Sequence, residues 1–325
     1  MTIPNGSRAK APHIPPSGVW VPAVTFFDPC TDTLDLASQK KYYRYLSTAG
    51  LAGLVILGTN AETFLLTREE RSTLISLARE AVPPSYPLIA GCGAHSTAQV
   101  LEHISDAATA GADYALVLPP AYFGKATTPS VIENFFLDIA SRSPLPVIIY
   151  NFPGVCNGVD MDSELITRIV RNAANANVVG VKLTCASVGK ITRLAATFAP
   201  DEFAVFGGQS DFLVGGLAAG SAGCVAAFGN VFPKSIVRVY ELWARGEHEE
   251  ALKLQGKAAL AESPVKAGIA AVKFASAAVG AAKAAGIEGA EEKLAPRRPY
   301  EPLGEAAKEG IRSVMAEMAK IEAGL

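Results

Sequence analysis

The chain has 325 residues, of which 50% are hydrophobic and 18% are charged, and its formal net charge is −2. This length accommodates either two domains of about 150 residues or one α/β barrel of about 250 residues. The hydrophobic content and the low net charge exclude a chain that is disordered throughout. The charge balance also argues against a nucleic-acid-binding or membrane-surface protein, which would normally present a basic face. We therefore expect a soluble, intracellular α/β protein.

The five cysteines and four histidines form no metal-binding pattern. No two cysteines have CxxC spacing, and no two histidines have the HxH or HExxH spacing of a metal site. No uninterrupted apolar run reaches the ~20 residues that a membrane span needs. We expect neither a metal ion nor an organic cofactor, and we expect the thiols to be reduced.

The first segment, Met1–Ser17, is predicted to be a flexible arm because prolines and a glycine interrupt it. Its basic residues, Arg8 and Lys10, are too few to identify a mitochondrial presequence, and no hydrophobic signal sequence is present. Together with the reduced thiols, these observations predict a cytoplasmic location.

From Gly18 onward, short apolar runs alternate with longer helical patterns. The runs are rich in Val, Ile and aromatic residues and lack strict alternation, as is typical of parallel strands that are buried on both faces. Eight such runs are present: Val19–Thr25, Leu54–Leu57, Leu88–Ala90, Tyr114–Leu118, Val147–Tyr150, Val178–Lys182, Phe203–Phe206 and Gly223–Ala227.

The segments between the runs carry the start and stop signals of helices. Thr67-Arg-Glu-Glu70 has the spacing of a capping box. Three glycines stand where helix C-caps are expected: Gly50, Gly111 and Gly246. Helices are predicted, among other places, over Asp35–Ala49, Thr67–Ala81, Ser96–Ala110 and Pro129–Arg142.

Eight successive βα units predict an α/β fold, a closed (β/α)8 TIM barrel over residues 18–246. The main alternative is an open, doubly wound sheet, which would usually carry a GxGxxG turn after its first strand. This chain has only Gly91-Cys92-Gly93, and it follows the third run. Residues 247–325 are predicted to form a C-terminal helical region that covers the barrel or a neighbouring subunit. Its helices are expected over Glu247–Glu262, Pro264–Ala285 and Leu303–Ala323.

In a TIM barrel, active-site groups lie at the carboxyl ends of the strands and in the loops that follow them. Lys182 ends an apolar strand, so its amine would be partly removed from water. Burial favours the neutral amine, and a neutral amine can attack a ketone to form a Schiff base. The alternative is an ordinary strand-end lysine that reaches solvent or pairs with a carboxylate.

Two other strand ends carry polar groups that suit catalysis. Tyr150 could move protons at a carbinolamine or at a substrate hydroxyl, although it could equally be an aromatic plug of the barrel. Gly58, Thr59 and Asn60 could bind a carboxylate through hydroxyl, amide and backbone N–H groups, or form an ordinary helix-capping turn. Glu62 lies too far along this loop to face the strand axis, so we interpret it as structural. Together these placements favour an enzyme.

The chain resembles the dihydrodipicolinate synthase / N-acetylneuraminate lyase family of pyruvate-dependent class I aldolases. The resemblance extends from about Gly18 to Gly310, and it depends on the order and spacing of several motifs. These motifs are Gly58-Thr-Asn-Ala-Glu62, Pro119-Pro-Ala-Tyr-Phe123, Tyr150-Asn-Phe-Pro153, Gly180-Val-Lys182 and Arg298-Pro-Tyr-Glu-Pro-Leu303.

The resemblance implies a role for each residue that matches the family pattern. Lys182 is implied to be the Schiff-base lysine, Tyr150 the acid/base tyrosine, and Thr59 its partner in a proton relay. Tyr122 resembles the tyrosine that family members lend to a neighbouring active site across a dimer interface, and the family is usually tetrameric. Gly223 and Cys224 fall where backbone groups approach the pyruvyl carboxylate.

Departures from the family pattern bear on the substrate. Family members that make dihydrodipicolinate generally have an arginine shortly after the Tyr-Asn-x-Pro segment, whereas Gly154-Val-Cys-Asn-Gly158 contains none. Loss of such a bidentate clamp is not conservative. Asn60, Ala61 and Ala121 also differ from the residues common in those synthases. Gly180–Cys185 followed by Gly207-Gly208-Gln-Ser210 resembles fungal 3-deoxy-hexulosonate aldolases.

We therefore predict a Schiff-base-forming lyase that cleaves a 4-hydroxy-2-keto acid, such as a 2-keto-3-deoxy sugar acid or 4-hydroxy-2-oxoglutarate, to pyruvate and an aldehyde. The loop Phe152–Gly158 and residues Gly207–Ser210, among them Gly207 and Gly208, are expected to recognise the aldehyde half. The first alternative is a synthase that condenses pyruvate with aspartate semialdehyde. The second is a catalytically inactive barrel that only binds a ligand. A homo-oligomer, dimer or tetramer, is expected.

Overall fold

Eight parallel strands pair in chain order in the computed structural model, which describes residues 13–174 and 177–325. Pairing of β1 with both β2 and β8 closes the barrel, so the predicted (β/α)8 fold is confirmed. Most of the predicted N-terminal arm, residues 1–12, lies outside the described residues. The strands are β1 (Gly18–Pro22), β2 (Gly53–Ile56), β3 (Leu88–Gly91), β4 (Tyr114–Val117), β5 (Val147–Asn151), β6 (Val178–Leu183), β7 (Ala204–Gly207) and β8 (Gly223–Val225).

The strands are buried on both faces, as their continuous apolar runs predict. Trp20 fills the inside of the barrel, where its ring makes edge contacts with Tyr114 and Phe206. Gly53 leaves the space for it, since a Cβ atom there would lie 2.2 Å from the indole. The barrel interior is therefore a packed core rather than a pore.

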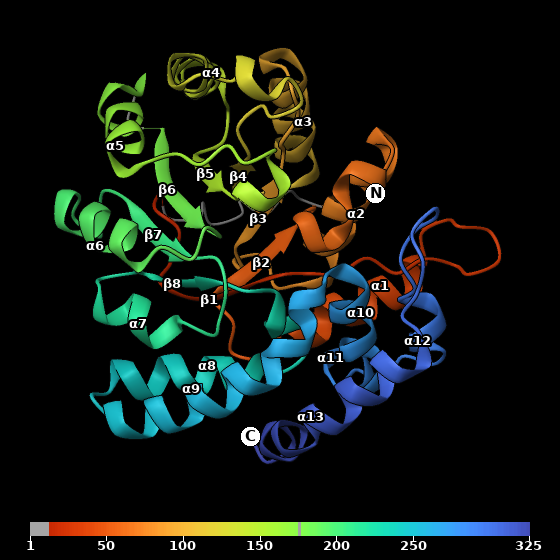
Figure 1. Cartoon of the computed structure of the whole chain (residues 1–325). Coiled ribbons are helices and arrows are strands. Elements are labelled where there is room, and N and C mark those ends of the chain that lie inside the picture. Colours follow the sequence, from red (N-terminus) through yellow and green to blue (C-terminus); the bar gives the residue numbers. More distant parts are fainter. Residues whose placement is uncertain (1–12, 175–176) are drawn as a thin grey trace, which may run out of the picture.

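Helices surround the barrel, and a second group of helices gathers along one side of it (Figure 1). Six of the first eight begin at a Ser, Thr or Asp whose side chain accepts a backbone N–H. The capping box predicted at Thr67 and Glu70 is present in both directions. The surrounding helices are α1 (Leu36–Ser47), α2 (Arg68–Ala81), α3 (Thr97–Ala110), α4 (Pro129–Arg142), α5 (Ser163–Asn172), α6 (Val188–Thr197), α7 (Leu213–Ala218) and α8 (Pro233–Ala244).

The C-terminal helices pack against the barrel through α8 and α1. They are α9 (His248–Glu262), α10 (Ile269–Ala278), α11 (Ala281–Ala284), α12 (Ala290–Lys293) and α13 (Glu305–Ala323). α8 ends and α9 begins on either side of Gly246, the boundary that the sequence predicts.

The prediction of one continuous helix over Pro264–Ala285 is wrong. A 3-10 turn, α10 and α11 occupy this stretch and are separated at Gly268 and at Val279–Gly280. Gly268 has a φ of 129°, which a helix does not permit. Gly280 lies so close to Val231 that a Cβ atom would approach its backbone to 2.7 Å. The breaks fold α10 back over the barrel mouth.

Within the residues described, no helix is both long enough and apolar enough to cross a membrane.

Barrel closure predicts a specific sensitivity to substitution at Gly223. Its φ is 137°, and an added Cβ atom would lie 2.0 Å from the Gly18 carbonyl oxygen in the closing strand pair. We expect Gly223→Ala to lower the free energy of unfolding by about 3 kcal/mol or more. Gly256→Ala, in α9 with open space around it, is the matched control and should be neutral or stabilising. Urea denaturation of both variants measures this, and equal stabilities would contradict it.

Candidate active site

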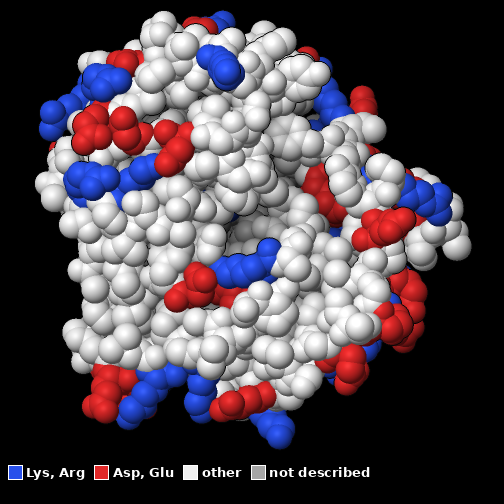
Figure 2. All heavy atoms as spheres, in the orientation of Figure 1, with Lys and Arg blue, Asp and Glu red and all other residues white. Residues whose placement is uncertain are grey.

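A cavity of about 670 Å³ opens at the carboxyl ends of the strands, the end where TIM-barrel active sites lie. One wall consists of residues that end or follow the strands: Thr59, Asn60, Tyr150, Phe152, Lys182, Thr184, Gly208 and Ala227. The C-terminal region supplies the opposite wall, with Glu262, Val265–Ala270, Val272, Pro296 and Tyr300. Figure 2 shows the hollow in the middle of this face, with charged side chains of both signs at its rim.

Lys182 points into this cavity from β6 and is only 2% exposed. Its Nζ lies 4.2 Å from the centroid of the Tyr150 ring. The buried Lys190 and Lys273 each pair with a carboxylate, whereas no carboxylate in the described part of the chain pairs with Lys182. The alternative of an ion-paired strand-end lysine does not fit these contacts.

Tyr150 stands directly opposite Lys182 in the pairing of β5 with β6. Its hydroxyl lies 3.3 Å from Oγ1 of Thr59, the first residue of a 3-10 turn that follows β2. Thr25 supports this turn by donating a hydrogen bond of 2.8 Å from its Oγ1 to the Ala61 carbonyl. The structure thus brings together Lys182, Tyr150 and Thr59, which come from three different strand ends.

The other predicted substrate-binding residues divide into two groups. Asn60 and Gly208 line the cavity. Gly58, Gly207, Gly223 and Cys224 do not line it, although each lies in a strand or within two residues of a strand end. The Cys224 side chain packs among the buried residues between barrel and helices, and burial raises the pKa of its thiol.

Tyr122, the fourth predicted catalytic residue, lies outside this cavity. Its side chain is 74% exposed, and its ring lies beside those of His95 and Phe123. Phe64 stacks on His95 and is also exposed. The four rings form an exposed aromatic patch, the residues Phe64, His95, Tyr122 and Phe123, beside the mouth of the barrel.

Sequence analysis missed the residues that the C-terminal region contributes to the cavity. It also missed Thr184, although this residue lies two positions after Lys182 and therefore on the same face of the strand. No local pattern marks Glu262 or Lys266 as cavity residues, because only the fold brings them opposite Lys182.

Glu262 and Lys266 form a polar cluster with the loop that follows β7. Ser210 donates a 2.5 Å hydrogen bond to Glu262 from its Oγ, and Lys266 Nζ lies 3.0 Å from the same carboxylate. Lys266 also contacts Asp211 at 2.9 Å and Gln209 at 2.6 Å. Burial raises the pKa of the Glu262 carboxyl, and the nearby Lys266 opposes this shift. We call these five side chains the Glu262 cluster.

In the part of the chain that the structure describes, no group of three or more His, Cys, Asp or Glu side chains could hold a metal ion.

The sequence matches the model of the dihydrodipicolinate synthetase family over residues 15–318. It is 68% identical over 314 residues to a Coccidioides immitis protein named "Putative 4-hydroxy-2-oxoglutarate aldolase, mitochondrial", covering 97% of this chain and 99% of the relative. It is 37% identical over 324 residues to an "L-threo-3-deoxy-hexylosonate aldolase" of Hypocrea jecorina, covering 96% and 99% of the two chains.

The prediction of a cytoplasmic location is wrong by comparison with these relatives. The Coccidioides protein is named as mitochondrial, and so is an Emericella nidulans 4-hydroxy-2-oxoglutarate aldolase that is 41% identical over 272 residues, 82% of this chain and 86% of that one. The prediction used thiol content and the small number of basic residues near the N-terminus. Thiol content does not determine the compartment to which a protein is delivered.

Solved structures agree with the family match. A Coccidioides immitis protein of the dihydrodipicolinate synthase family has a TM-score of 0.91 and 65% identity, with 97% of this chain and 99% of that chain covered. The Escherichia coli K12 protein YagE, solved in complex with pyruvate, has a TM-score of 0.83 and 25% identity, with 94% and 98% covered. The chain belongs to the dihydrodipicolinate synthetase family.

Proposed function

We propose that this protein is a class I aldolase that cleaves a 4-hydroxy-2-keto acid to pyruvate and an aldehyde through an imine at Lys182. The observation that carries the proposal is a buried lysine without a carboxylate partner, in contact with the Tyr150–Thr59 pair. The names of the fungal relatives, which are aldolases for this class of substrate, support it.

In this mechanism, the neutral Lys182 amine attacks the C2 carbonyl of the substrate, and loss of water gives a protonated imine. Tyr150, relayed by Thr59, removes the proton of the C4 hydroxyl. The C3–C4 bond then breaks, the electron pair enters the imine to form an enamine, and the aldehyde leaves. Tyr150, which has taken up that proton, protonates the enamine at C3. Hydrolysis of the imine then releases pyruvate and the free lysine. Every step uses groups of the chain and water, so no cofactor is required.

The substrate carboxylate is assigned to the turn after β2. Thr59 and Asn60 offer hydroxyl and amide donors at the cavity wall, and Gly58 precedes them. Backbone groups of Gly223 and Cys224 are the second candidate contact. The aldehyde half would then extend toward Gly207, Gly208 and the Glu262 cluster.

The Glu262 cluster favours an aldehyde half with hydroxyl groups over one with a second carboxylate. Besides Lys182, Lys266 is the one cation that lines the cavity among the described residues, and it is already paired with Glu262 and Asp211. Carboxylate, amide and hydroxyl groups together suit the donors and acceptors of a polyol. We therefore favour a 2-keto-3-deoxy sugar acid over 4-hydroxy-2-oxoglutarate. The same lack of a free cation disfavours dihydrodipicolinate synthesis, for which the chain also lacks the arginine clamp.

We also propose that the protein is a homo-oligomer, a dimer or a tetramer. The aromatic patch supports this proposal, because Phe64, Tyr122 and Phe123 are 56%, 74% and 75% exposed beside the barrel mouth. Contiguous exposed aromatic surface is typical of protein–protein interfaces. A second copy seated there would bring its own Tyr122 near this active site.

Trapping with borohydride tests the imine. Wild-type protein treated with pyruvate and borohydride should gain the mass of one reduced pyruvyl group, and Lys182→Ala should gain none. Tyr150→Phe, which keeps the ring against Phe152, should lower kcat for cleavage at least 100-fold because it removes the acid/base hydroxyl. An unchanged mass of the wild type, or an adduct that survives Lys182→Ala, would rule out this mechanism.

A substrate panel tests the preference for a hydroxylated aldehyde. Pyruvate release from 2-keto-3-deoxy sugar acids should exceed release from 4-hydroxy-2-oxoglutarate in kcat/KM, and condensation with aspartate semialdehyde should be undetectable. A higher kcat/KM for 4-hydroxy-2-oxoglutarate would contradict the assignment of the Glu262 cluster to hydroxyl groups.

Light scattering tests the proposed interface. The wild type should have the mass of a dimer or a tetramer, and Phe123→Asp should reduce it because the charge would be buried in the interface. Leu260→Asp is the control, since Leu260 is 74% exposed on α9 and lies outside the patch. A monomeric wild type, or equal masses for all three proteins, would overturn this proposal.

The raised pKa of Glu262 predicts a pH-dependent cost to folding. A carboxyl whose pKa is higher in the folded state binds more protons there, so stability falls as the pH rises above about 4.5 through the raised value. Glu262→Gln removes this cost, and the melting temperature of the variant relative to wild type should therefore be higher at pH 8 than at pH 5. The same difference at both pH values would show that Glu262 is not perturbed.

A further inference from the structure

The Glu62 carboxylate lies in the cavity wall, and the C-terminal region binds it from the side away from the cavity. Its Oε2 lies 2.5 Å from Nζ of Lys273, and its Oε1 accepts a 2.7 Å hydrogen bond from the backbone N–H of Arg297. The side chains of Glu62 and Lys273 are 3% and 0% exposed. The mechanism above uses neither residue, yet Glu62 lines the same cavity as Lys182.

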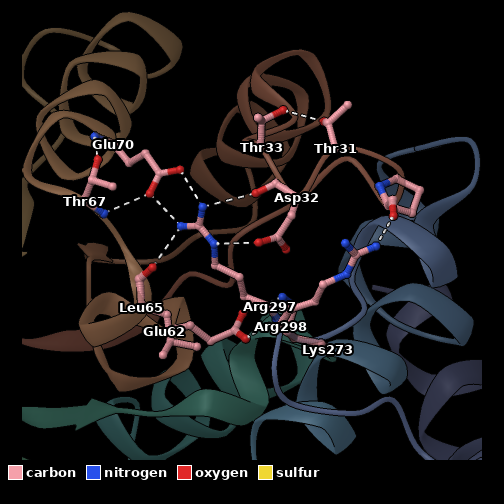
Figure 3. Close-up of polar contacts among 11 residues, drawn as sticks. Thr31, Asp32, Thr33, Glu62, Leu65, Thr67, Glu70, Lys273, Arg297 and Arg298 are labelled. Carbon is pink, nitrogen blue, oxygen red and sulfur yellow. Dashed lines mark hydrogen bonds and ion pairs between the residues drawn. The ribbon is translucent and has the colours of Figure 1, made fainter.

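Arg297 extends this contact to the start of α2. Its guanidinium lies 2.5 and 2.8 Å from the two carboxylate oxygens of Glu70, the acid of the capping box. It also donates to the Leu65 carbonyl at 2.9 Å and faces Asp32 (Figure 3). Arg297 therefore connects the C-terminal region to the 3-10 turns, at Glu62 and Leu65, and to the first turn of α2, at Glu70.

Glu62 has a backbone conformation that needs such support. Its φ and ψ are 59° and 37°, in the left-handed region, and it joins the 3-10 turn Thr59–Ala61 to the turn Thr63–Leu65. A residue other than glycine remains there only when its surroundings hold it. Because Thr59 begins the first turn, the position of its hydroxyl against Tyr150 depends on this conformation.

The charge of Glu62 requires a partner as well. A carboxylate three positions from Thr59 would repel a keto acid bound at the same turn. Lys273 compensates that charge from the side away from the cavity, since it contacts Glu62 but does not line the cavity. The pair thus leaves the wall neutral for an anionic substrate.

We infer that Lys273 and Arg297 are positioning residues for the proton relay, which hold Glu62 so that Thr59 meets Tyr150 in a site without excess negative charge. The inference rests on the proposed aldolase function. It makes the C-terminal region a part of the active site rather than a cover over it.

The test separates positioning from stability. Replacing a buried ion pair by apolar residues of similar volume often preserves stability. The double variant Glu62→Met/Lys273→Met should therefore fold, but the turn Thr59–Ala61 should lose the contacts that Glu62 makes with Lys273 and Arg297. We expect imine trapping with pyruvate to stay within twofold of wild type, because Lys182 is untouched. Cleavage kcat and deuterium exchange at C3 of pyruvate should both fall at least tenfold, because they need the Tyr150–Thr59 relay.

Glu322→Gln is the matched control. Glu322 is also a buried carboxylate that joins the C-terminal region to the barrel, through the backbone of Lys234 and Ser235, but it lies away from the cavity. Its variant should keep kcat and exchange within twofold. Arg297→Lys provides a second test that needs no double substitution. It removes the guanidinium fork that holds Leu65 and Glu70 after the Glu62 turn, and it should lower kcat at least threefold while trapping is retained.

A double variant that traps pyruvate, folds and retains wild-type kcat and exchange would overturn the inference. Should the double variant not fold, wild-type kcat in Arg297→Lys would overturn it instead. A wild type that traps no pyruvate would refute the proposed function itself, so failures of the two proposals are distinguishable.

Discussion

The pairing of β5 with β6 places Tyr150 opposite Lys182, and the proposed chemistry depends on this register. Neighbouring strands lie about 4.8 Å apart, so paired side chains on the same face are in contact. A shift of one residue would turn Lys182 toward the helices and remove its amine from the cavity. The closed barrel protects the register, because each strand is held on both sides.

The barrel places the amine, but the C-terminal region controls its environment. That region supplies one wall of the cavity, Glu262 and Lys266 of the Glu262 cluster, and the counter-ion of Glu62. Lys266 and Lys273 of that region are paired with carboxylates, whereas Lys182 has no carboxylate partner among the described residues. One cavity thus holds a lysine paired with carboxylates, Lys266, and the buried Lys182, which contacts the Tyr150 ring.

The barrel and the residues at its strand ends were predictable because they depend on local patterns. Short apolar runs mark the buried strands, and Lys182 stands at the end of one. The break at Gly280 was not predictable, since it results from the approach of Val231 across the fold. The same holds for the Glu62–Lys273 pair, whose members are 211 positions apart. The alanine-rich pattern of α10 does not indicate that its Lys273 will contact Glu62.

The family resemblance, rather than spacing alone, connected Lys182, Tyr150 and Thr59 with an aldolase. The structure adds that the three groups meet in one cavity. The clearest measurement of the central claim is a crystal structure of the protein soaked with pyruvate. Continuous electron density from Lys182 Nζ to C2 of pyruvate, with the carboxylate at Thr59 and Asn60, is the result that the account predicts. Pyruvate bound without a covalent bond, or attached to Lys266 instead, would contradict it.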